Sequence, residues 1–72
     1  MHTVEIPVSF EYKGYVHKGF LCSPGGNVWF LTVHMQYWGT LSLTKEEWRF
    51  QGDEGLSDLT DYFADVVVAW YE

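Results

Sequence analysis

The sequence predicts an α+β fold: an antiparallel β-meander of four to five strands with one C-terminal α-helix packed on one face. Three observations predict it. Residues 4–12 alternate apolar and polar side chains, which is typical of a half-buried strand. Glycine-containing turns interrupt the strand-like segments at short intervals. Residues 57–71 carry apolar side chains at helical spacing. A chain of 72 residues is expected to form one compact domain, over 1–72.

The first half of the chain is predicted to form three strands, at about 4–12, 15–22 and 28–36. Pro7 has no N–H to give to a neighbouring strand, so the first strand is expected at an edge of the sheet. Gly14 favours a tight two-residue turn between the first two strands, because glycine tolerates the positive φ that such turns require.

The apolar pattern also predicts which strand residues face each other. A two-residue turn places Tyr12 opposite Tyr15, and across the next loop we expect Cys22 to pair with Val28. Leu21 should then face Trp29. In this register one face of the sheet carries the large apolar residues Val4, Ile6, Val8, Phe10, Leu21, Trp29, Leu31, Val33 and Met35.

Two shorter strands, at about 39–44 and 48–51, are predicted to precede a helix over about 57–71. Ser57 is the expected N-cap of this helix. Its expected core stripe contains Leu59, Phe63, Val66 and Trp70. Gly19, which has no side chain, should leave room on the sheet for Trp70.

Composition narrows the function classes. The formal net charge is −6, with four lysines and arginines against ten acids. We therefore expect no direct nucleic-acid binding and no attachment to anionic lipid, and a basic protein or a second copy as partner. No segment has the roughly 18–20 apolar residues that span a bilayer. The single cysteine, Cys22, and the lack of a signal-like N-terminus indicate a cytoplasmic protein.

The face of the sheet away from the helix is the first candidate interaction surface. One helix covers one face, so Phe20, Val28 and Phe30 on the other face need a different cover. Three covers are open: the later aromatic residues Tyr37, Trp38 and Phe50 of the same chain, a second copy in a homodimer, or a foreign ligand.

The acids of the C-terminal segment form the second candidate surface. Asp58, Asp61, Asp65 and Glu72 share one side of the expected helix, away from the core stripe. Two interpretations are open: a solvated face that keeps the domain in solution, or a docking face for a basic protein. The expected contact residues of such a docking face are Asp58, Asp61 and Asp65, with Val68 and Tyr71 as apolar neighbours and Ala64 beside them.

Catalytic and metal sites are not expected. His17 and His34 should point to opposite faces of the sheet, and His2 supplies no third ligand at a suitable spacing. Cys22 stands among apolar residues, which disfavours a reactive thiolate. No catalytic, cofactor-binding or metal residue is therefore assigned.

The prediction is a small acidic non-enzymatic protein-interaction module that self-associates through the uncovered sheet face. The first alternative is an acidic inhibitor or decoy that docks through its helix on a basic, nucleic-acid-binding protein. The second is a small enzyme or ligand-binding domain.

Overall fold

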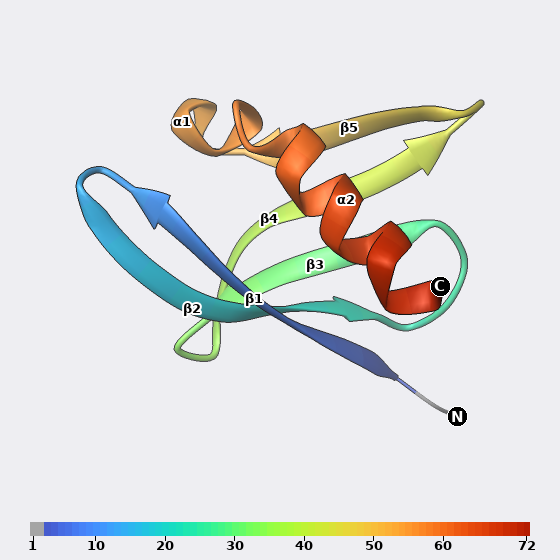
Figure 1. Cartoon of the computed structure of the whole chain (residues 1–72), viewed down its shortest axis with the longest axis horizontal. Helices are drawn as coiled ribbons and strands as arrows, with labels where there is room; N and C mark the ends of the chain where they lie inside the picture. The colour runs from blue at the N-terminus through green and yellow to red at the C-terminus, as the bar shows by residue number, and fades with distance from the viewer. Residues whose placement is uncertain (1–2) are drawn as a thin grey trace.

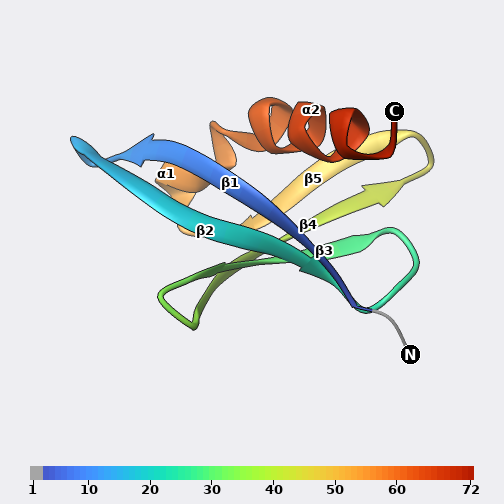
Figure 2. The same ribbon diagram turned by 60° about the horizontal axis from the view of Figure 1, so that its bottom comes forward.

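Five strands form one antiparallel sheet in the order β1-β2-β3-β4-β5, in a computed structural model that describes residues 3–72 (Figure 1). A one-turn helix and a longer helix follow, and the longer one lies across the concave face of the curved sheet (Figure 2). The predicted α+β meander with a C-terminal helix is therefore confirmed. The elements are β1 (Val4–Tyr12), β2 (Tyr15–Ser23), β3 (Val28–Val33), β4 (Gln36–Thr44), β5 (Glu47–Gly52), α1 (Glu54–Ser57) and α2 (Thr60–Tyr71).

The β1–β2 hairpin has the predicted register. Tyr12 pairs with Tyr15 across a two-residue turn in which Lys13 and Gly14 both have positive φ, 53° and 81°. This is the backbone pattern of a type I′ turn, whose twist matches that of the strands it joins. β1 lies at one edge of the sheet, as Pro7 predicts.

The register between β2 and β3 differs from the prediction by two residues. Leu21 faces Leu31 instead of Trp29. The pair Cys22 and Phe30 encloses seven residues, where the expected pair Cys22 and Val28 enclosed five. Within this connection Gly25 and Gly26 both take positive φ, 134° and 71°. A shift of two residues leaves each side chain on its predicted face, so the expected division into inner and outer residues survives.

The expected third strand, 28–36, was too long, and the fourth, 39–44, too short. The chain turns at His34 and Met35, which have φ of 51° and 65°. Met35 is therefore fully exposed rather than part of the core face. Neither residue is a glycine, asparagine or aspartate, so the usual signal for such a turn is missing from the sequence.

β4 contains one extra residue, Trp38, opposite the step from Leu31 to Thr32 in β3. A bulge of this kind bends its strand and increases the local twist. The ring of Trp38 lies on the inner side of the sheet, with its centroid 6.0 Å from that of Phe10.

The helical segment begins differently from the prediction. Asp53 caps α1, since its carboxylate accepts the N–H of Gly55 at 3.3 Å. Ser57 is not an N-cap: it lies in the last turn of α1, where its hydroxyl donates to the carbonyl of Glu54. α2 starts only at Thr60 and has no side-chain cap.

α2 buries Phe63, Ala64 and Val67 against the sheet. Trp70, expected in the core, is 51 % exposed, and Ala64, expected beside the acids, is buried. Gly19 does not receive Trp70 either; the atoms nearest to its missing side chain belong to β3. The two stripes share Phe63, but the buried one is turned towards Ala64 and Val67, by roughly 70° at 100° per residue.

The break between the two helices does not explain this rotation. It removes only Leu59 from the expected stripe, because Phe63, Val66 and Trp70 all lie within α2. The orientation of α2 is instead tied to β1, because the hydroxyl of Tyr62 donates a hydrogen bond to the carbonyl of Ser9.

The core fills the concave side of the sheet under α2. Phe63, completely buried, has its ring centroid 5.4 Å from that of Phe10 on β1 and 5.5 Å from that of Phe50 on β5. One side chain of the helix therefore joins the two edge strands, and the sheet curls around it. Neither helix of residues 3–72 has the length and apolar character needed to cross a membrane.

Candidate functional site

The outer, convex face of the sheet carries an exposed aromatic cluster. Phe20 on β2 is 46 % exposed and Phe30 on β3 is 37 % exposed. Phe20 pairs with Thr32 and Phe30 with Cys22, so the two rings are diagonal neighbours on the same face. The residues predicted for this surface are thus brought together where the sequence placed them. We call Phe20, Val28, Phe30 and Tyr37 the outer patch.

Tyr37 extends this patch rather than covering it. The bulge turns it to the outer face, where its ring lies edge-on to Phe30 with centroids 6.3 Å apart. Tyr37 itself remains largely exposed. Trp38 and Phe50, the other two expected covers, pack on the inner side. The expectation that these residues cover the outer face is therefore wrong for Trp38 and Phe50. Tyr37 covers it only in part.

The hydroxyl groups in and beside the outer patch already have partners. The hydroxyl of Thr40 is hydrogen bonded to that of Tyr37. The hydroxyl of Thr32 lies 3.5 Å from the carbonyl of Phe20 and 3.7 Å from the sulfur of Cys22. Removing this face from water would leave few new unpaired hydroxyls, which lowers the cost of covering it.

Two shallow hollows, of about 360 and 390 Å³, open on the outer face on either side of Lys18 and Phe20. The first lies towards Pro7 on β1, and the second towards Thr32 on β3. The side chains of a partner can fit into hollows of this kind beside an exposed ring.

Charge is divided between the sheet and the helices. The four acids that precede Asp53 are balanced by the four lysines and arginines of the chain. All of the net charge of −6 therefore lies in 53–72, which contains six acids and no lysine or arginine. The sheet is close to neutral, whereas the helical side is strongly anionic.

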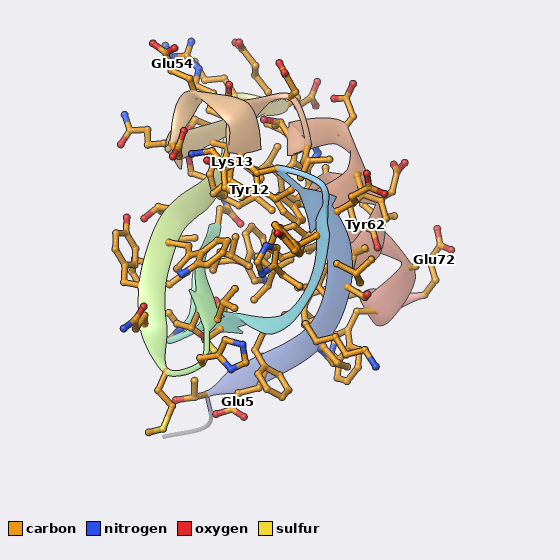
Figure 3. All side chains as sticks on the ribbon, turned by 90° about the vertical axis from the view of Figure 1, so that its left-hand side faces the viewer. Glu5, Tyr12, Lys13, Glu54, Tyr62 and Glu72 are labelled. Atoms are coloured by element: carbon orange, nitrogen blue, oxygen red, sulfur yellow. The ribbon has the colours of Figure 1, made fainter. Side chains whose placement is uncertain are left out.

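The acids predicted as a second surface are all exposed, but they do not share one helix. Asp61 and Asp65 lie in α2, Asp58 lies in the turn before it, and Glu72 follows its last turn. Val68 and Tyr71 are exposed beside them, as predicted, while Ala64 is not. Figure 3 shows Glu72 and Glu54 at the rim of the molecule, pointing away from the enclosed core.

The two described histidines lie in different environments. His17 packs on the inner side, its ring centroid 5.0 Å from that of Trp38, while His34 is exposed in the β3–β4 turn. His2 lies outside the described residues. Across residues 3–72, no three His, Cys, Asp or Glu side chains gather as metal ligands.

Sequence reasoning missed one electrostatic contact, between the β1–β2 hairpin and α1. The Tyr12 hydroxyl and the N–H of Gly55 lower the pKa of Asp53 below its ordinary 3.8. Asp53 in turn raises the pKa of Tyr12 above 10.0, although the contact falls short of normal hydrogen-bond geometry. Lys13 adds an exposed ion pair with Asp53 at 3.9 Å. Figure 3 shows Tyr12 and Lys13 at the hairpin end, below the helical turn that carries Glu54.

This contact is a clasp between two elements, the β1–β2 hairpin and α1. The only hint in the sequence was the spacing of Asp53 and Gly55, which suits a capping carboxylate. The partner Tyr12, about 40 residues away, could not be inferred.

Comparisons with known protein families, with curated proteins and with solved structures find no match.

Proposed function

We propose that this chain is a small non-enzymatic protein-interaction module that self-associates through the outer patch. The observation that carries the proposal is the cluster of exposed rings, Phe20, Phe30 and Tyr37, on a face that α2, the one long helix of residues 3–72, does not reach. Soluble monomers rarely leave a contiguous apolar patch of this kind in water.

Two copies of the chain fit together better through their outer faces than through their helical sides. The sheet residues carry almost no net charge, so two outer faces can approach with little repulsion, whereas two helical sides would bring six acids against six. A twofold arrangement lets the same patch complement itself. A stable contact of this type buries at least about 1,000 Å² in total.

The free thiol of Cys22 supports placing the protein in a reducing compartment, the cytoplasm.

Sedimentation of the parent chain and of two variants tests the proposal. Phe30→Lys puts two like charges near the twofold axis and should give a folded monomer. Trp70→Lys introduces the same charge at an exposed aromatic residue on the helical side, and should leave the dimer intact. A parent chain that stays monomeric at several hundred micromolar, or a Trp70→Lys variant that dissociates as readily as Phe30→Lys, contradicts self-association through this face.

A second candidate function is docking on a basic protein through the helical side, as an acidic inhibitor or decoy. The observation that favours it is the concentration of the entire net charge in 53–72. A titration with a lysine-rich peptide, followed by NMR shifts of α2, tests it; shifts that are absent at low salt would contradict it.

A further inference from the structure

A groove of about 560 Å³ opens beside the C-terminal half of α2. Its aromatic floor is formed by Trp29 on β3 and Trp48 on β5, whose ring centroids lie 5.4 Å apart. Leu43 of β4 and Val68 and Tyr71 of α2 add apolar walls, and Glu72 stands at the mouth. Gly26 and Asn27 of the β2–β3 loop line the same groove, at the end of the molecule where Figure 1 shows the C-terminus. We call it the tryptophan groove.

Trp29 lies beneath the groove with little of its surface exposed. Its side chain is only 5 % exposed, and its indole nitrogen is covered and meets no acceptor in the part of the chain that the structure describes. A ligand in the groove therefore meets the exposed edge of the indole ring and gains apolar contact there rather than a hydrogen bond.

Charge restricts the kind of ligand further. The helix that forms one wall belongs to the segment with six acids and no lysine or arginine, and Glu72 lines the mouth itself. An anionic ligand, or a second copy of this chain with its charge of −6, would be repelled. A cationic ligand with an apolar part complements both the floor and the rim.

We propose that the tryptophan groove binds a lysine- or arginine-rich peptide segment of a partner protein. An aliphatic or aromatic side chain of the segment enters between Trp48 and Val68, over the edge of the Trp29 ring. The flanking cations of the segment face Glu72. A central apolar anchor inside a charged rim is the usual arrangement of an energetically important contact. This proposal rests on the second candidate function and locates its binding site.

The test uses a capped hexapeptide, Lys-Lys-Ile-Leu-Lys-Lys, and NMR of the protein labelled with nitrogen-15. The indole N–H signal of Trp29 should shift saturably as the peptide is added. Val68→Lys places a cation in the wall, and Tyr71→Ala removes an aromatic wall; each should weaken binding by about tenfold or more. Both side chains are exposed, so the fold should survive. Tyr15→Lys adds the same charge on an exposed part of the β1–β2 hairpin and should leave the affinity unchanged.

Two further peptides separate the possible failures. If the peptide binds but Trp29 does not shift, and replacing Ile-Leu by Gly-Gly costs nothing, the groove proposal is overturned while docking on the acidic surface stands. If the lysine-rich peptide does not bind at all, both the groove and the second candidate function are overturned. Equal binding of the glutamate analogue, Glu-Glu-Ile-Leu-Glu-Glu, overturns the cationic specificity on which the proposal depends.

Discussion

At Gly19, β2 and β3 approach so closely that no side chain can be accommodated. A Cβ atom there would lie 2.2 Å from the carbonyl oxygen of Thr32 and 2.9 Å from a methyl group of Val33. The first contact is with backbone, which cannot rotate away. This agrees with the burial of Gly19 but not with its expected role as a seat for Trp70.

Gly19→Val should therefore destabilise the protein by about 1–3 kcal/mol or more, because β3 has to move. Urea denaturation measures the loss. Lys18→Val, at the exposed neighbouring position, serves as the control and should stay within about 0.5 kcal/mol of the parent. An equally small effect of Gly19→Val would contradict the close approach of the two strands.

Phe63 and Trp70 should respond very differently to truncation. Phe63 is completely buried between Phe10 and Phe50, so Phe63→Ala should cost about 3–5 kcal/mol and leave little of a small domain folded. Trp70 is 51 % exposed, and Trp70→Ala should cost much less. Thermal unfolding followed by circular dichroism compares the two. If Trp70→Ala destabilised the protein as much as Phe63→Ala does, Trp70 would belong to the core, as the sequence predicted.

At the scale of the elements, the clasp between the β1–β2 hairpin and α1 makes stability depend on pH. The pKa of Asp53 is lowered in the folded protein, so its contribution is present above its ordinary value of 3.8 and is lost as the pH falls through the folded value. The pKa of Tyr12 is raised, so its contribution is present below 10.0 and is lost as the pH rises through the folded value.

Tyr12→Phe removes the hydroxyl from this clasp and keeps the ring. The difference in free energy of unfolding between the parent and Tyr12→Phe should be present at neutral pH and shrink in acid, once Asp53 is protonated in both states. Tyr37→Phe is the matched control, because the hydroxyl of Tyr37 is bonded to Thr40 and not to an acid. A Tyr12→Phe difference that stays constant down to acid pH would show that the clasp contributes nothing through ionisation.

Elements with a local signal were predictable, and those without one were not. Pro7 and Gly14 identified an edge strand and a two-residue turn, and period-two alternation identified the faces of β1 and β2. The turn at His34 and Met35 was missed because it contains none of the residues that usually mark a turn, which are glycine, proline, asparagine, aspartate and serine. Because strand faces depend only on parity, Phe20 and Phe30 were still placed correctly on the outer side.

At the scale of the whole molecule, the tryptophan groove could not be predicted. It joins Trp29, Trp48 and Val68 from three elements, and it exists only because α2 has one particular rotation. That rotation is tied to a contact between Tyr62 and Ser9, residues far apart in the sequence. Charge, in contrast, needs no fold to be located: the six acids after Gln51 indicated an anionic side from the sequence alone.

The two proposed surfaces should respond to salt in opposite directions, since one is apolar and the other anionic. Sodium sulfate strengthens apolar burial, and salt also screens the repulsion between two chains of charge −6, so self-association through the outer patch should tighten. Binding of the lysine-rich peptide beside Glu72 should weaken, because sodium chloride screens the attraction between exposed charges. Sedimentation and peptide titration at low and high salt measure the two effects on the same protein. If self-association weakened with salt as the peptide affinity does, the contact between copies would be electrostatic, and the outer patch would not be its site.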